Sequence, residues 1–248
     1  NVGAMSSIMA REIRALFVAG AREPTEWSGR PLIGLDCWSP NININRDPRW
    51  GRNMEVASED PLLTSDYVYE YSSKLQETEL SSKHLAAIPT IKHWAAYSLD
   101  DSDGFTRYDF NAIVDAFDLA DTYLVAFHTG ITKADAKGVM CSYNALNGIP
   151  TCASPFLRNK LRNEWNYTGY VTSDTGAVQF IYQTHKYAKT PEEAACAALR
   201  DGNTDIDSGF VYNTYLAKGV CGCQASRCCR RGHGTQSGSR RGNARPSE

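Results

Sequence analysis

The alternation of strand-like and helix-like segments is what most constrains the fold of this chain. Short apolar stretches rich in β-branched and aromatic residues predict strands at residues 32–38, 86–91, 138–143, 170–172 and 204–207. Segments with helical spacing of apolar residues lie among them, at residues 6–19, 67–80, 110–129, 155–165, 177–181, 191–200 and 212–217. Such alternation is typical of a parallel sheet built from βαβ units. Pro89 conflicts with a central strand, because proline cannot donate to the ladder.

Dense polar clusters directly follow the predicted strands. They comprise residues 41–60, 92–103 and 143–148, and Asp174. Barrels and doubly wound sheets both place their active sites at the carboxyl ends of their strands. The sequence contains no Gly-rich phosphate-binding loop, which disfavours a nucleotide-binding sheet.

Asp174 stands between a predicted strand and a predicted helix, in the segment Gly169–Gly176. An acidic residue at this point of a barrel is typical of a catalytic group. An N-cap of the following helix is the other interpretation, because aspartate is a preferred capping residue. Position alone favours the cap.

Two further segments carry candidate binding residues. The loop Asn45–Arg52 holds three arginines and a tryptophan, which suit sugar hydroxyls or carboxylates, although pairing of the arginines with nearby acids would make it structural. Lys92 and His93 end a predicted strand, where they can bind a polar ligand and keep a neighbouring carboxylate ionised. Tyr143 ends the next strand and can donate a hydrogen bond to Asp174.

Two features bear on the compartment in which the chain folds. Cys141 and Cys152 flank a short loop, and their spacing fits a disulfide or two buried thiols equally well. Asn166-Tyr-Thr is an N-glycosylation sequon, which is used only in a secreted protein. The chain opens on Asn1 and shows no leader, and we still expect a secreted, extracellular protein.

Charge and hydropathy exclude two classes of partner. Residues 1–217 contain 19 basic and 27 acidic residues, and such an acidic body argues against nucleic-acid binding. No run of 18 apolar residues is present, which argues against a membrane span. The oligomeric state is not predicted.

Five motifs taken together resemble the N-terminal domain of glycoside hydrolase family 3, most of all its β-xylosidase and α-L-arabinofuranosidase branch. They are Asp-Pro-Arg-Trp-Gly-Arg52, Lys92-His-Trp94, Met140-Cys-Ser-Tyr-Asn144, Asn147-Gly-x-Pro-x-Cys152 and Val171-Thr-Ser-Asp174. Their order and spacing also match that family. The resemblance extends from about Ser6 to Gly219.

The resemblance implies a retaining exo-glycosidase on a (β/α)8 TIM-like barrel, incomplete at both ends, within residues 1–219. It implies Asp174 as the nucleophile and Arg52, Lys92, His93 and Tyr143 as the substrate-binding residues. It further implies an oligosaccharide substrate with terminal β-D-xylosyl or related residues, and neither metal nor cofactor. The family's general acid/base lies on a second domain, so an impaired fragment or a carbohydrate-binding remnant is the alternative.

Further features of the sequence qualify these expectations. Thr175 follows the expected nucleophile. At this position the β-glucosidases of the family usually have tryptophan and the xylosidases usually have cysteine, so the sequence favours a pentose over a hexose substrate without deciding between them. Glu55 and Glu59 are chemically suited to acid catalysis, but a role as partners of the loop arginines is the stronger interpretation.

Residues 220–248 are rich in Cys, Arg and Gly, lack apolar periodicity and match no common zinc spacing. We expect a disordered, aberrant tail.

Overall fold

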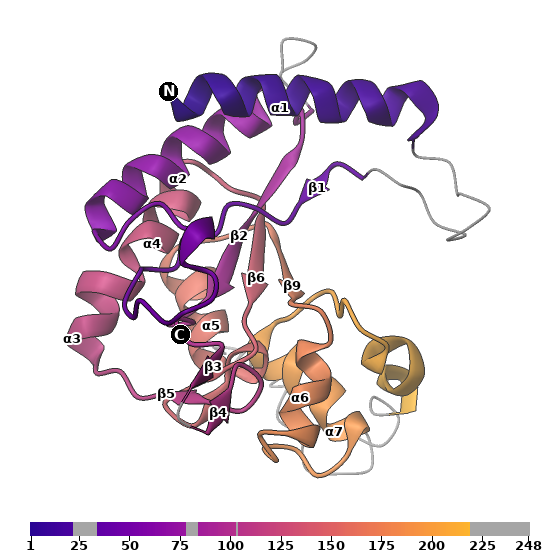
Figure 1. Ribbon diagram of the computed structural model, residues 1–248. Helices are drawn as coiled ribbons and strands as arrows, with labels where there is room; N and C mark the ends of the chain where they lie inside the picture. Colours follow the sequence, from indigo (N-terminus) through magenta and orange to yellow (C-terminus); the bar gives the residue numbers. More distant parts are fainter. Residues whose placement is uncertain (22–33, 78–83, 103, 219–248) are drawn as a thin grey trace, which may run out of the picture.

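A four-stranded parallel sheet forms the centre of the computed structural model, which describes residues 1–21, 34–77, 84–102 and 104–218 (Figure 1). Its strand order is β1-β2-β6-β9. The strands are β1 (Asp36–Cys37), β2 (Ile88–Trp94), β6 (Gly138–Cys141) and β9 (Tyr170–Ser173). A parallel bridge between Thr172 and Ile206 continues the sheet beyond β9. The predicted α/β class with a parallel sheet is therefore confirmed.

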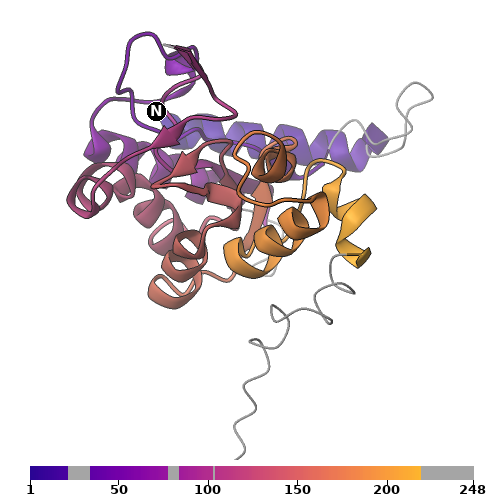
Figure 2. The same cartoon turned by 90° about the horizontal axis from the view of Figure 1, so that it is seen from below.

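Helices lie around the outside of these strands (Figure 2). The longer ones are α1 (Val2–Leu16), α2 (Pro61–Gln76), α4 (Val125–Thr132), α6 (Ala177–Gln183) and α7 (Pro191–Ala197). Shorter helical segments are α3 (Ala116–Asp118), α5 (Pro155–Arg158), Asn159–Glu164, Ala198–Gly202 and Tyr212–Leu216. The small strands β3 (Asp101–Ser102), β4 (Phe105–Thr106), β5 (Asn111–Ala112), β7 (Ala145–Leu146) and β8 (Ile149–Pro150) lie at the opposite end of the sheet from α1 (Figure 1).

Side-chain caps determine where three of the helices begin. Asp60 accepts a hydrogen bond from the backbone of Leu62 at 2.7 Å, so α2 begins six residues earlier than its apolar pattern predicts. Ser154 and Thr190 cap α5 and α7 in the same way, as predicted for α5. Each of these helices has proline in its first turn, where the missing N–H has no partner in any case.

The core is anchored by Trp94 at the end of β2. Its buried ring meets Phe127 of α4 and Trp165 edge-on, with centroid distances of 5.2 and 5.6 Å. Gly130 allows α4 to approach β2 closely, because a Cβ there would lie 3.1 Å from the side chain of Ile91. The end of β2 is thereby held between α4 and the segment that precedes β9.

The helix predicted over residues 110–129 is wrong in its first third. Asn111–Ala112 pairs with β7 as strand β5, and the helical part begins only after Asp115, whose side chain caps it. Ile113 and Phe117, expected in the core, are 77% and 74% exposed, whereas Leu124 and Phe127 are buried. The backbone pairing and the cap override the apolar periodicity of the segment.

Pro89 is tolerated inside β2 because of where the neighbouring strand begins. The backbone N–H of Ile88 donates to Leu35 on the β1 side, so the nitrogen of Pro89 faces the β6 side. Pairing with β6 starts one residue later, between Thr90 and Gly138. No ladder bond is therefore lost at Pro89, and the conflict seen in the sequence disappears.

Some sequence predictions fall outside the described residues. These are the tail at 220–248, the beginning of the first predicted strand at 32–33 and the end of a predicted helix at 78–80. Within the described ranges, no helix is long and apolar enough to cross a membrane.

A disulfide closes the loop that follows β6. Cys141, the last residue of β6, is joined to Cys152 eleven positions later, and both are buried. The hairpin of β7 and β8 lies within this loop. The cross-link therefore fixes the segment that contains Tyr143.

We predict that replacing both cysteines by alanine lowers the free energy of unfolding by about 2–3 kcal/mol, because the cross-link restricts the unfolded chain over a short loop. Urea denaturation of the oxidised parent and of the double variant measures this difference. Cys37→Ala, which removes a half-buried free thiol, is the control and should change stability by less than about 1 kcal/mol. Equal stabilities of parent and double variant would contradict the prediction.

Candidate active site

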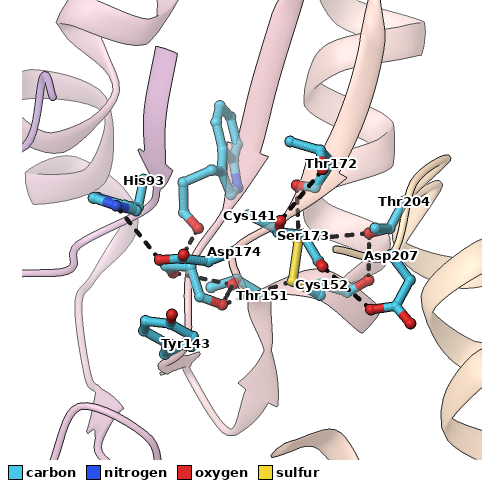
Figure 3. Close-up of a disulfide and its surroundings, with 12 residues drawn as sticks. His93, Cys141, Tyr143, Thr151, Cys152, Thr172, Ser173, Asp174, Thr204 and Asp207 are labelled. Carbon is cyan, nitrogen blue, oxygen red and sulfur yellow. Dashed lines mark hydrogen bonds and ion pairs between the residues drawn. A yellow bond between two sulfur atoms is a disulfide. The ribbon is translucent and has the colours of Figure 1, made fainter. Parts of the chain in front are cut away.

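Four side chains converge at the carboxyl ends of the strands. Arg52 comes from the loop after β1, His93 from the end of β2, Tyr143 from the loop after β6, and Asp174 directly follows β9. Figure 3 shows His93 to the left of Asp174 and Tyr143 below it, with the disulfide to the right. Lys92, next to His93, also belongs to this cluster. Of the predicted site residues, only Asn166 and the two disulfide cysteines do not.

Asp174 is fixed by its backbone and is largely buried. Its N–H donates to the carbonyl of Cys141 at 3.0 Å, and its Oδ1 accepts the N–H of Thr175 at 2.7 Å. Its Oδ2 is buried and accepts no well-formed hydrogen bond from the described residues. Asp174 does not cap α6 with its side chain, because that helix begins at Ala177 after a left-handed Gly176. One carboxylate oxygen is thus held and the other is left unbound.

Burial raises the pKa of Asp174 above its ordinary value of 3.8. Four groups oppose this shift, namely the N–H of Thr175, the hydroxyl of Tyr143 and the positive charges of Arg52 and Lys92. The carboxyl group is consequently poorly solvated but has cationic and donor groups around it. This combination suits a carboxylate that must be ionised and reactive.

His93 is neutral in this arrangement and acts on its neighbours as a hydrogen-bonding group, not as a cation. Burial, and then the charges of Arg52 and Lys92, hold the pKa of His93 well below 6.5. Arg52 Nη1 lies 3.0 Å from Nε2 and can only donate, so Nε2 accepts and the ring proton is on Nδ1, 3.1 Å from Asn43 Oδ1. His93 Nε2 lies 3.5 Å from Asp174 Oδ2.

Arg52 is oriented by two partners. Its guanidinium donates to both carboxylate oxygens of Glu55, at 2.8 and 2.7 Å, in addition to His93. The partner role expected for Glu55 is therefore observed, and Arg52 holds the pKa of Glu55 below its ordinary value despite the opposing effect of burial. Lys92 is half-buried, and burial followed by the charge of Arg52 lowers its pKa. Both cations lie close enough to act on Asp174.

Tyr143 is held by hydrogen bonds on either side of it in the loop. Ser142 donates to the carbonyl of Trp94 at 2.6 Å, and Asn144 donates to the carbonyl of Ala95 at 3.3 Å. Burial, and then the nearby Asp174, raise the pKa of Tyr143, so its hydroxyl remains a proton donor at physiological pH. The loop after β6 is therefore bonded directly to the end of β2.

Three residues of the site were not found from the sequence. Tyr97 is buried beneath Arg52 and His93, and Asp100 accepts a hydrogen bond from its hydroxyl. Arg107 lies over the ring of Tyr143, with its guanidinium carbon 5.3 Å from the ring centre. Arg107 also donates to the Tyr108 hydroxyl at 2.7 Å. The signal that was available is the polar segment after the second strand, in which an arginine, two tyrosines and four aspartates stand within residues 97–109.

Asn166 lies away from this cluster. It is exposed, has a left-handed backbone with φ of 51°, and precedes β9, whereas Asp174 follows it. Among residues 1–21, 34–77, 84–102 and 104–218, no group of three His, Cys, Asp or Glu side chains is arranged to hold a metal ion.

Comparison with known proteins places the chain in a family. The model of the glycosyl hydrolase family 3 N-terminal domain matches residues 31–216. The β-xylosidase/α-L-arabinofuranosidase 2 of Medicago sativa subsp. varia is 45% identical over 218 residues, covering 87% of this chain and 27% of that protein. A probable exo-1,4-β-xylosidase of Aspergillus clavatus is 47% identical over 189 residues, covering 75% of this chain and 24% of that protein.

Solved structures give the same relationship. A family 3 exo-β-xylosidase in complex with a xylobiose aziridine activity-based probe superposes with a TM-score of 0.81 at 34% identity, covering 89% of this chain and 27% of that one. A β-glucosidase of Listeria innocua in complex with glucose gives a TM-score of 0.67 at 29% identity, covering 90% and 30%. The chain spans about a quarter of the length of these relatives. It belongs to glycosyl hydrolase family 3.

Proposed function

We propose that this chain contributes the nucleophile and most of the sugar-binding residues of a retaining exo-glycosidase acting on terminal β-D-xylosyl or related residues of oligosaccharides. The observation that carries the proposal is the environment of Asp174. Its carboxylate is desolvated, one oxygen is held by Thr175, and the other is unbound beside Arg52, His93 and Tyr143. Relatives named as β-xylosidases support the choice of substrate.

The chemistry follows from these groups. Oδ2 of Asp174 attacks the anomeric carbon, a carbon–oxygen bond to aspartate forms, and the bond to the leaving group breaks with its electron pair. Water then hydrolyses the glycosyl-enzyme and restores the configuration. Arg52 and Lys92 donate hydrogen bonds to ring hydroxyls, and such bonds strengthen in the oxocarbenium-like transition state. We assign no general acid, since the carboxylate of Glu55 is bound by Arg52.

We further propose that the sheet is part of a (β/α)8 barrel. The strands at residues 36, 88, 138, 170 and 206 neighbour one another in the order of the sequence, without a reversal. A doubly wound sheet reverses its strand order at the switch point where it binds its ligand, and a barrel does not. The superposition on the family 3 exo-β-xylosidase supports this proposal.

Covalent trapping tests the nucleophile. We expect dinitrophenyl 2-deoxy-2-fluoro-β-xyloside to add one fluoroxylosyl group to Asp174, because its leaving group needs no proton. A leaving group that depends on a general acid would react roughly 10²–10⁴-fold more slowly without one. Intact-mass and peptide mass spectrometry measure the adduct. Asp174→Asn should abolish it.

Asp205→Asn is the matched control. Asp205 is also an aspartate, but it lies near the beginning of β9, away from the site, where it pairs with Arg162 at 3.0 Å. This variant should label as the parent does. A folded parent that gains no adduct, or gains it on another residue, would refute the nucleophile. Binding of xylose without any adduct would instead indicate a carbohydrate-binding protein.

The raised pKa of Asp174 gives opposite pH effects on reactivity and stability. We expect the labelling rate to rise with pH through that pKa, since only the carboxylate attacks. The folded state binds this proton more tightly than the unfolded state, so the stabilisation is full below pH 3.8 and is lost as pH rises through the raised pKa. Asp174→Asn should therefore be more stable than the parent at pH 7, and this gain should shrink on acidification.

Urea denaturation of both proteins at several pH values measures the second effect. The prediction would be contradicted if Asp174→Asn were less stable than the parent at pH 7, or if its gain in stability grew on acidification.

We propose secretion, with Asn166 as a glycosylation site. The buried disulfide fits an oxidising compartment, and Asn166 and Thr168 are both exposed in a turn before β9. A glycan there points away from the strand ends that hold Asp174.

Expression through a eukaryotic secretory pathway tests this modification. We expect a mass increase that peptide N-glycosidase removes. Thr168→Ala should abolish the increase and Thr168→Ser should retain it, since the sequon accepts either hydroxyl residue. A secreted, disulfide-bonded parent without a glycan would refute the site.

A further inference from the structure

Tyr97 lies at the centre of the site without reaching its surface. Its ring is fully buried and meets His93 edge-on at a centroid distance of 5.1 Å and Tyr143 at 6.2 Å. The guanidinium of Arg52 stands 5.7 Å from the ring centre. One side chain thus contacts three of the four residues proposed to bind sugar, although these come from three different parts of the chain.

The hydroxyl of Tyr97 connects the ring to a fourth element. It donates a short hydrogen bond to Oδ1 of Asp100. The same oxygen lies 4.0 Å from Nη1 of Arg107, whose guanidinium covers the ring of Tyr143 at 5.3 Å. Burial, and then Asp100, raise the pKa of Tyr97, so the hydroxyl keeps its proton at physiological pH.

We propose that Tyr97 is a positioning residue that sets the spacing between the two walls of the sugar site. One wall is Arg52 with His93, and the other is Tyr143 with Arg107. The aromatic ring separates the walls, and the hydroxyl holds the Asp100–Arg107 segment against the second wall. This inference rests on the proposed glycosidase function of the same site, and Tyr97 itself touches no reacting atom.

The geometry predicts a particular kinetic effect. Tyr97→Phe keeps the ring and its edge contacts but releases Asp100, so the wall that contains Arg107 and Tyr143 loosens. The concentration of fluoroxyloside at half-maximal labelling rate should rise about tenfold, the order expected for one lost buried hydrogen bond. The maximal labelling rate should change less than about threefold, because Asp174 keeps its bonds to Thr175 and Cys141.

Asp100→Ala removes the same hydrogen bond from the acceptor side and provides a second, independent variant. Its side chain is only partly buried, so loss of folding is not expected. It should raise the concentration at half-maximal labelling rate as much as Tyr97→Phe does. The variant that carries both substitutions should show no larger increase than either single variant, since each of the three proteins lacks the same hydrogen bond.

Tyr167→Phe is the matched control. Tyr167 is also buried, and its hydroxyl donates to the carbonyl of Tyr170 at 2.9 Å, at the other end of β9. It should lower thermal stability to a similar extent but leave both labelling constants unchanged. Parent-like labelling constants in Tyr97→Phe and Asp100→Ala, or an equal shift in Tyr167→Phe, would overturn the positioning role. A parent that is not labelled at all would overturn the glycosidase function and this inference with it.

Discussion

The register of β2, β6 and β9 is the constraint on which the site depends. Trp94 pairs with Cys141, and Cys141 pairs with Ser173, so the three strands end at one level of the sheet. The N–H of Asp174 completes this register by donating to Cys141. A shift of one residue in a parallel pair would turn the side chain of Asp174 to the opposite face. Backbone pairing, more than any side-chain contact, therefore directs the carboxylate toward His93 and Tyr143.

Charge in the site is distributed unevenly around this carboxylate. Arg52 and Lys92 supply positive charge, whereas His93 is neutral and serves as an acceptor that holds Arg52. A protonated His93 would face Arg52 and Lys92 inside a buried space, which would be costly. The neutral ring thus follows from the presence of two other cations, and it holds Arg52 in a fixed direction within the site.

The sequence predicted the strands of the parallel sheet, most helices and the residues that follow those strands, because these depend on local patterns. It did not predict the small strands β3, β4, β5, β7 and β8. It did not predict the interruption of the 110–129 helix, which depends on β5 pairing with a strand more than 30 residues away. It treated Lys92 and His93 as a pair of similar groups. Burial and the charge of Arg52 lower the pKa of both, but only the imidazole, whose ordinary pKa is 6.5, becomes neutral. Tyr97 and Arg107 were missed for the same reason, since their roles depend on contacts between loops.

The cost of keeping Oδ2 of Asp174 buried and unbound explains why the surroundings are so firmly connected. A buried, unsatisfied polar oxygen costs about 1–3 kcal/mol, and relaxation of the loops would relieve that cost by admitting a donor. Three features oppose such relaxation. The disulfide closes the loop after β6, Ser142 and Asn144 bond that loop to the end of β2, and Asn43 binds both the backbone N–H and the carbonyl of His93. The rigidity of the loops therefore keeps the carboxylate of Asp174 in this arrangement.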